Sequence, residues 1–160
     1  MNCVTLGGVE DYLTQHGIEF KAHEHPPVQT CEELAQHGVP GLPCKNLFLR
    51  DQKKTRYLLV VLPAAQRTDL RKLAEQVGDK KLSFVNPETL MKKLGVEPGA
   101  VSPFGLLNNT EGDVELWIDR EVMEAPLVHF HPNRNTASLE LTGEMFQRYL
   151  DAIRRSHFII

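Results

Sequence analysis

The segment from Gly95 to Asn109 constrains the fold of this chain more than any other. Its first eleven residues contain three glycines and two prolines. Proline lacks a backbone N–H and glycine weakens regular structure, so we expect a shaped loop with no helix or regular strand running through it. Between Gly99 and Pro103, the amides of Ala100, Val101 and Ser102 are candidates to point outward and polarise a carbonyl or hold a hydroxyl. The alternative is an ordinary structured turn.

The rest of the chain alternates between helical and strand-like patterns, without an internal repeat or a linker. Helices are expected from a Thr5 cap to about His16, from Thr30 to Gln36, from Asp69 to Val77 with Thr68 as the cap, from Asn86 to about Leu94, around 120–124 and from Gly143 to Arg155. Strands are expected over 18–23, 47–49, 57–62, 81–85, 104–107, 114–119, 127–131 and 136–141. The run 57–62 is apolar on both faces and should be a central strand. These patterns predict one domain over 1–160, a mixed α/β fold with a curved, mainly antiparallel sheet flanked by helices.

Composition places the chain among ordinary globular proteins, with 41% hydrophobic and 24% charged residues in a length of 160. No apolar run approaches the roughly 20 residues of a membrane helix, and the first ten residues lack the pattern of a signal peptide. The three cysteines form no Cys-x-x-Cys pair, which argues against a disulfide framework or a zinc ribbon. We expect a cytoplasmic protein that is monomeric and does not bind a membrane.

Charge is segregated along the sequence, although the net charge is only −3. Between Lys45 and Lys93 there are 12 Lys or Arg and 5 Asp or Glu, a local excess of +7, and the remainder carries −10. Several basic residues cluster around an expected hairpin and soon after it: Arg50, Lys53, Lys54, Arg56, Arg67, Arg71, Lys80 and Lys81. A basic surface of this kind can steer a polyanion such as a nucleic acid. The alternative is that these residues simply solvate helix faces.

Several short motifs together resemble one known family. They are His25-Pro26-Pro27-Val28, Thr30-Cys31-Glu32-Glu33, Lys45 to Asp51, Lys81 to Phe84, Gly99 to Pro103, His131-Pro132-Asn133 and Asn135-Thr136-Ala137. In this order they resemble the YbaK-like, prolyl-tRNA synthetase-associated editing domains, over nearly the whole chain. The closing segments are similar to the free-standing branch that hydrolyses alanine mischarged on proline tRNA. The resemblance implies the same mixed α/β fold, a mischarged aminoacyl-tRNA as substrate and no cofactor or metal.

Lys45 is the first candidate for a catalytic residue. It follows a Pro-Cys loop and begins a strand, where its ammonium group can reach a substrate at the sheet rim. Most lysines are merely exposed, but the resemblance assigns Lys45 to the lysine that deacylation requires. A cation there can hold the terminal phosphate or polarise the ester carbonyl. Asn46 beside it offers a donor and an acceptor to the substrate.

His131 is the second candidate, because the proline after it restricts its backbone and aims its side chain reproducibly. From the residues alone, a histidine satisfied in or near the core is an equal alternative. The resemblance implies that His131 binds the terminal adenosine or orders the site. His25 and Thr30 match positions near the substrate, with loop and cap roles as equal alternatives; Phe104 and Asn133 are further candidates for substrate contact.

The resemblance implies a hydrolysis with a steric sieve. Water attacks the aminoacyl ester, the amides of the Gly99 to Pro103 loop stabilise the oxyanion, and the neighbouring ribose hydroxyl helps to activate the water. A small apolar pocket accepts the alanine methyl and rejects proline, with Leu47, Phe48 or Val101 as candidate walls. A second sieve is needed because missing methylenes contribute only about 1 to 3 kcal/mol each to discrimination in the synthetase.

Other interpretations remain open. His23-x-His25 and His129-x-His131 could contribute to a metal site, although no third ligand has a convincing spacing. Cys44 could be a nucleophile with His131 as base, and the basic region could serve a non-catalytic tRNA-binding module. Serine and cysteine are alternative amino acids, and Gln29, Cys44 and Asn109 depart from the family pattern. A transient contact with prolyl-tRNA synthetase or an elongation factor is a further possibility.

Overall fold

A computed structural model describes residues 8–27 and 37–160 of the chain. Its helices are α1 (Gly8–Gln15), α3 (Leu70–Val77), α4 (Pro87–Leu94), α5 (Arg120–Glu124) and α6 (Gly143–Ala152), with 3₁₀ helices η1 (Pro98–Ala100) and η2 (Pro103–Asn108). Its strands are β1 (Lys21–Glu24), β2 (Cys44–Asp51), β3 (Tyr57–Pro63), β4 (Leu82–Phe84), β5 (Val114–Ile118), β6 (Leu127–Phe130), β7 (Ala137–Thr142) and β8 (His157–Ile159). The expected helix 30–36 and the Thr5 cap lie outside the described residues.

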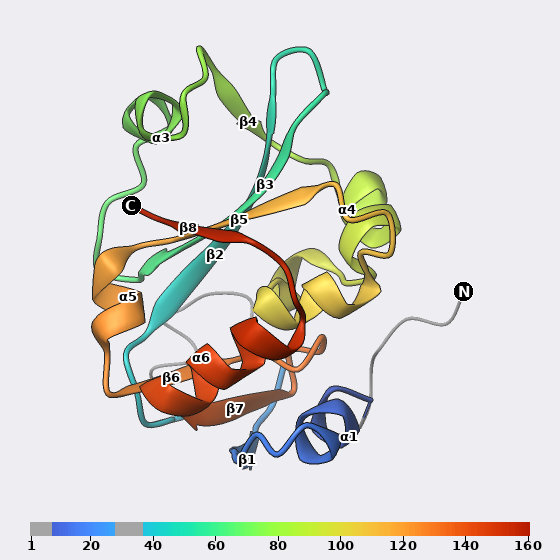
Figure 1. The fold of residues 1–160 in the computed structure, drawn as a ribbon, viewed down its shortest axis with the longest axis vertical. Helices are drawn as coiled ribbons and strands as arrows, with labels where there is room; N and C mark the ends of the chain where they lie inside the picture. The colour runs from blue at the N-terminus through green and yellow to red at the C-terminus, as the bar shows by residue number, and fades with distance from the viewer. Residues whose placement is uncertain (1–7, 28–36) are drawn as a thin grey trace.

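The strands form two sheets, which Figure 1 shows at the two ends of the molecule. The larger has the order β4-β2-β3-β5-β8, and the smaller has the order β1-β7-β6. All pairings are antiparallel except β3 with β5 and β5 with β8. The mixed α/β class and the mainly antiparallel pairing are therefore confirmed, but the expected single curved sheet is divided in two. An isolated bridge between Leu42 and Val128 links the chain entering β2 to the smaller sheet.

The five-stranded sheet is apolar on both faces because it packs between two layers. Alternate residues of β2 and β3 point to opposite sides. Leu58, Val60 and Leu62 of β3 join a cluster covered by α3, whereas Leu59 and Val61 join a larger cluster. The larger cluster also takes in residues of α1, α4, η2, the smaller sheet and α6. The central position of β3, between β2 and β5, confirms the expectation for 57–62.

Local sequence signals fix several helix ends. Asn86 caps α4 by accepting from the amide of Thr89, Pro87 opens the helix, and Gly95 ends it in the left-handed conformation at φ 66°. Thr142 likewise caps α6. The cap of α3 is Asp69 and not Thr68, because the Asp69 carboxylate accepts from two amides of the first turn.

The expected strand over 104–107 and the expected end of the last helix are wrong. Residues 104–107 form part of η2 and not a strand, because Pro103 favours a helical start and the Ser102 hydroxyl caps the amide of Phe104. The last helix ends at Ala152, and the chain then adds the edge strand β8 beside β5. No described helix is both long and apolar enough to cross a membrane.

Candidate active site

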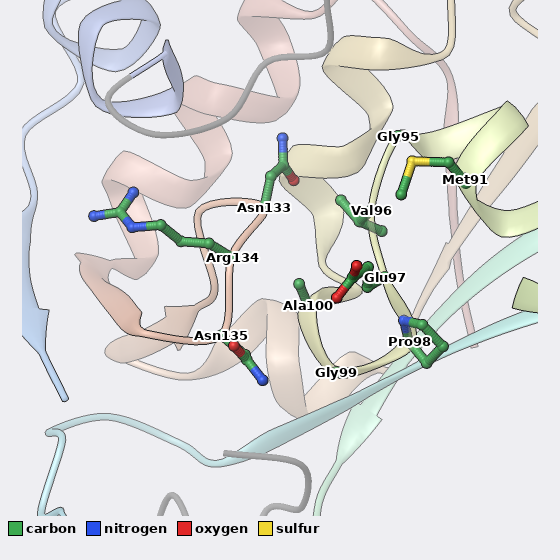
Figure 2. Close-up of a pocket in the computed structure, with 10 residues that line it drawn as sticks. All are labelled: Met91, Gly95, Val96, Glu97, Pro98, Gly99, Ala100, Asn133, Arg134 and Asn135. Atoms are coloured by element: carbon green, nitrogen blue, oxygen red, sulfur yellow. The ribbon is translucent and has the colours of Figure 1, made fainter. Parts of the chain in front are cut away.

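Two loops that are distant in sequence enclose a cavity of about 400 Å³. One side is the end of α4 and η1, and the other is the loop after β6, as Figure 2 shows. The lining consists of Met91, Gly95, Val96, Glu97, Pro98, Gly99, Ala100, Asn133, Arg134 and Asn135. This volume falls in the range of small-molecule sites. Among the expected site residues, Gly99, Ala100 and Asn133 lie on its wall.

The backbone of the loop offers fewer donors than the sequence indicated. The amide of Ala100 donates to the carbonyl of Glu97 at 2.9 Å, so it does not point outward as a free donor. That expectation is corrected by the 3₁₀ turn η1, which uses the amide internally. In the part of the chain that the structure describes, the amides of Gly99, Val101 and Ser102 donate no hydrogen bond to another backbone group. Gly99 is therefore the donor candidate that also lines the cavity.

Ser102 and Pro103 tie this loop to the rest of the site. The wholly buried Ser102 hydroxyl donates to the carbonyl of His131 at 2.7 Å and accepts from the amide of Phe104 at 3.1 Å. The carbonyl of Pro103 accepts from the buried Tyr149 hydroxyl at 2.7 Å. These contacts hold the start of η2 against both α6 and the loop after β6.

Asn133 and Phe104 meet on the other side of the same junction. Asn133 has a left-handed backbone at φ 62°, and its side-chain amide donates to the carbonyl of Phe104 at 3.3 Å. The Phe104 ring is fully buried and packs edge-on against Phe130 and Tyr149. Phe104 therefore supports the site from the core and does not line the cavity.

His131 has a defined tautomer, because its Nδ1 lies 2.8 Å from the carbonyl of Ala137. A carbonyl only accepts, so Nδ1 carries the proton and Nε2 presents a lone pair. Burial lowers the pKa of His131, the contact with Ala137 raises it less, and His25 and His129 lower it further. The imidazole is therefore held neutral near pH 7.

His25 packs beside His131, with ring centroids 5.9 Å apart. Its Nδ1 donates to the carbonyl of Pro26, so its Nε2 accepts from the hydroxyl of Ser138 at 3.0 Å. No motif pointed to Ser138, which lies wholly buried on β7. The structure thus brings His25 and His131 together, whereas Thr30 lies outside the described residues.

Lys45 lies on β2 opposite Leu62, and its ammonium group donates to the carbonyl of Gln66. Residues at odd positions of β2, such as Leu47, face the cluster under α3. Phe48, by contrast, is buried in the larger cluster with Ala100 and Phe104. Of the two candidate pocket walls Leu47 and Phe48, only Phe48 therefore lies on the sheet face that carries the loop. Among the described residues, no hydrogen bond joins the Lys45 side chain to Gly99–Pro103.

Asn46 lies opposite Val61, on the same face as Phe48. Its side-chain oxygen Oδ1 is buried, and none of the residues in 8–27 or 37–160 donates a hydrogen bond to it. Buried acceptors without a partner are rare in native proteins. Asn46 is therefore better placed than Lys45 to present a polar atom on the loop-bearing face.

A polar network fixes the far end of the loop. Asn109 donates to the Lys93 carbonyl and the Asp113 carboxylate, and accepts from the amide of Val114 and from Arg155. Lys93 in turn donates to Asp113 at 2.6 Å. The family departure at Asn109 thus lies in a structural network behind the cavity.

The alternatives from the sequence find little support among the described residues. No group of three or more His, Cys, Asp or Glu in 8–27 and 37–160 could hold a metal ion. His23 instead contacts Glu140, and His129 contacts the carbonyl of Pro40. The thiol of Cys44 donates to the carbonyl of Leu42 at 3.3 Å.

Seven of the ten lining residues were not among the expected site residues, namely Met91, Gly95, Val96, Glu97, Pro98, Arg134 and Asn135. Asn135 belongs to a motif that the sequence singled out, but Arg134 carried no signal. Arg134 is held by Glu10 of α1 and Glu24 of β1 at 3.1 to 3.4 Å. Its guanidinium thus fixes the loop after β6 to the N-terminal part of the described fold.

Known proteins resemble this chain in sequence and in structure. Residues 25–149 match the model of the aminoacyl-tRNA editing domain. The Prolyl-tRNA editing protein ProX of Acetoanaerobium sticklandii is 38% identical over 88% of this chain and 87% of its own length. The Multifunctional Ser/Thr-tRNA deacylase ProXp-y of Escherichia coli is 28% identical over 58% of each chain. A solved structure described as a candidate trans-editing enzyme for prolyl tRNA synthetase shares the fold, with a TM-score of 0.72 and 22% identity over 93% of this chain and 91% of that one.

Proposed function

We propose that this chain, which belongs to the aminoacyl-tRNA editing domain family, deacylates mischarged alanyl-tRNA(Pro) in trans. Membership confirms the resemblance found in the sequence and the enzyme class expected there, an aminoacyl-tRNA deacylase. The reaction removes alanine before it reaches proline codons. The single observation that favours proline tRNA is the 38% identity to a relative named as a prolyl-tRNA editing protein, over nearly the whole chain.

The proposed chemistry is hydrolysis of the ester between the amino acid and the terminal ribose. The oxygen of a water molecule attacks the ester carbonyl carbon, and the carbonyl oxygen becomes an oxyanion. The ester C–O bond then breaks, and the ribose oxygen leaves as a hydroxyl after taking up a proton. Backbone donors aimed at the oxyanion are worth most when they are fixed in advance. Gly99 supplies such a donor at the cavity wall, held by the contacts of Ser102 and Pro103.

His131 contributes a neutral acceptor to this site. Its Nε2 lone pair can orient the attacking water or a ribose hydroxyl, because Ala137 holds the proton on Nδ1. The adjacent ribose hydroxyl can assist in activating the water, as the family resemblance implies. Asn46 and Asn133 are the candidates for polar contacts with the terminal adenosine and the amino acid.

We assign the cation of the site to Lys45 on the strength of the family motif. In the structure its ammonium group contacts the carbonyl of Gln66, so contact with the substrate requires the side chain to exchange this neutral acceptor for a phosphate or the ester carbonyl. A charge-assisted hydrogen bond is stronger than one to a neutral carbonyl, which favours the exchange. Mischarging of proline tRNA by a synthetase supplies this substrate. A cytoplasmic, monomeric enzyme stays our prediction.

Replacement of Lys45 by Ala tests the proposal. Loss of one fixed donor to a developing oxyanion typically costs about 10²- to 10³-fold in rate, and we expect a loss of that order in alanyl-tRNA(Pro) hydrolysis. Lys21→Ala is the matched control, because Lys21 is exposed on β1. If Lys45→Ala retains full activity with folding intact, Lys45 is only a structural tie to Gln66 and the assignment fails.

Two other functions are separated by the same assay. The relative named as a Ser/Thr-tRNA deacylase makes serine a competing amino acid for this chain. Faster loss of serine than of alanine from proline tRNA would support that specificity. Salt-dependent tRNA binding without any ester hydrolysis would instead support a non-catalytic binding module.

A further inference from the structure

The fold brings two separate basic segments of the sequence to one place. Lys53 and Lys54 lie at the turn between β2 and β3, and Lys80 and Lys81 lie between α3 and β4. All four side chains are exposed, and we call them the lysine rim. A depression of about 510 Å³ joins the two segments, with Lys53 and Lys80 both on its wall. Figure 1 shows the hairpin, α3 and β4 together at the end of the molecule away from the smaller sheet.

The carboxylates nearest to the lysine rim are engaged inside the protein. Asp51 is only 5% exposed and accepts from the hydroxyl of Thr55 and from the amides of Thr55 and Arg56. Asp79 and Glu115 both pair with the guanidinium of Arg56, at 3.2 and 2.7 Å. These three carboxylates are therefore paired within the protein, while the ammonium groups of the lysine rim face solvent.

This arrangement discriminates between kinds of anion. A small anion inside the depression would lie against Asp51 and Asp79, which line it, and like charges repel. A polyanion that spans the depression would instead contact the exposed lysines on both sides. The surface therefore fits an extended phosphate backbone better than a single phosphate.

The position of the lysine rim fits the shape of the proposed substrate. Lys45 and Asp51 lie six steps apart on β2, which is about 20 Å at 3.3 Å per residue. Stacked nucleotides advance about 3.4 Å each along one strand, so about six nucleotides span this distance. A tRNA whose 3′ end is held by Lys45 would reach the lysine rim beyond its unpaired end, with the first base pairs of its acceptor stem.

We propose that Lys53, Lys54, Lys80 and Lys81 form a docking surface for the double-stranded acceptor stem of the aminoacyl-tRNA. This proposal rests on the proposed function, because the docking surface would hold the same aminoacyl-tRNA substrate. It reads the phosphate backbone and not the base sequence. Its contribution is to the capture of substrate, so it affects kcat/KM more than kcat at saturating tRNA.

The test compares two variants with the same change in net charge. The rim variant carries Lys→Gln at 53, 54, 80 and 81, and the control variant carries K21Q, R120Q, R148Q and R154Q, all exposed positions outside the hairpin, α3 and β4. For full-length alanyl-tRNA(Pro), we expect kcat/KM of the rim variant to fall about tenfold or more. The slope of log kcat/KM against log salt should shrink by about 0.9 for each phosphate that the variant no longer neutralises. The control variant should stay within about twofold of wild type.

A second substrate separates docking from chemistry. A 3′-alanyl CCA trinucleotide has no acceptor stem, so the rim variant and wild type should hydrolyse it at the same rate. Equal losses for the rim and control variants on full-length tRNA would overturn the docking surface. If wild type hydrolyses neither substrate, the proposed function fails. Binding of uncharged tRNA then tests the docking surface independently of catalysis. Weaker binding by the rim variant alone supports the docking surface, and equal binding by all three proteins refutes it.

Discussion

The hydroxyl of Ser102 donates to the main-chain carbonyl of His131 at 2.7 Å, which joins the glycine- and proline-rich loop to the His-Pro-Asn segment. The same oxygen accepts from the amide of Phe104, so one buried hydroxyl satisfies a donor and an acceptor. The two motifs are 29 residues apart in sequence. Their relative position, and hence the shape of the cavity, depends on this contact.

Ser102→Ala should therefore reduce both stability and activity. The amide of Phe104 loses its partner in a fully buried place, which typically costs about 1 to 3 kcal/mol. We expect a fall of that size in the free energy of unfolding from denaturant titration, together with a lower kcat for alanyl-tRNA(Pro). Ser156→Ala is the control, since Ser156 is exposed near the C-terminus. Unchanged kcat in a folded Ser102→Ala protein would show that the contact does not position the site.

Tyr149 anchors the same loop from α6, through its hydroxyl bond to the carbonyl of Pro103. Tyr149→Phe keeps the packing but leaves that carbonyl without this donor, so the free energy of unfolding should fall by about 1 to 2 kcal/mol. Tyr12→Phe is a matched control, because the Tyr12 ring is only partly buried and stacks on His16 near the surface of α1. Equal stabilities of the two variants, measured by thermal and denaturant unfolding, would argue against the Tyr149 anchor.

Much of this architecture could be predicted from local sequence, and the errors have physical causes. The predicted ends of α4 agree with the structure, because Asn86, Pro87 and Gly95 act through bonds within a few residues. The edge strand β8 is not predicted, because its three residues, 157–159, are too few to show a hydrophobic period. Its partner β5 is also distant in sequence.

The candidate site was predicted less completely than the fold. The motifs named His25, Ser102, His131 and Asn133, and the structure brings these four residues to one junction. It could not be predicted that Ala100 uses its amide within η1, because that depends on the conformation of the turn. The partner of Lys45 was equally hidden, since the carbonyl of Gln66 reaches it only through the pairing of β2 with β3.

Gly41 lies where the chain crosses from the smaller sheet to β2, and it requires the absence of a side chain. Its φ is 111°, and an added Cβ would lie 3.0 Å from the backbone of Val128. Gly38 also has positive φ, at 64°, but among the residues that the structure describes an added Cβ would meet nothing within 4 Å. Gly38→Ala should cost about 1 to 2 kcal/mol for the left-handed backbone. Gly41→Ala should cost at least about 1 kcal/mol more because of the contact with Val128.

The comparison of these two glycine variants isolates close packing from backbone strain. Denaturant titrations of both proteins give the difference in their free energies of unfolding. Equal destabilisation would mean that Val128 moves away without cost, and that the crossing is less tightly packed than the structure indicates.

Acid should destabilise the protein through two histidines, the buried His129 and the half-buried His131. Burial lowers the pKa of both His129 and His131 below the ordinary value of 6.5. The unfolded chain therefore binds protons in a range where the folded protein does not, so stability is fully present above about pH 6.5 and falls as the pH drops toward the folded pKa values. Unfolding measured between about pH 7.5 and about pH 5.5 should show this decline.

The variant His129→Gln separates this effect from other titrations. It removes one of the two lowered pKa values, so its stability should depend less steeply on pH over the same range, whatever its absolute stability. Hydrogen bonds and ion pairs hold the pKa values of carboxylates such as Asp51 and Glu115 below their ordinary values, so these groups do not titrate in this window. An unchanged slope would contradict the role given to His129.

The most direct test of the central claim is the loss of alanine from proline tRNA, measured beside the loss of proline from the same tRNA. We predict multiple turnovers of alanyl-tRNA(Pro) by wild-type protein, while prolyl-tRNA(Pro) decays at its spontaneous rate. Persistence of both esters at their spontaneous rates would contradict hydrolysis by this site, and equal loss of both would contradict the steric sieve.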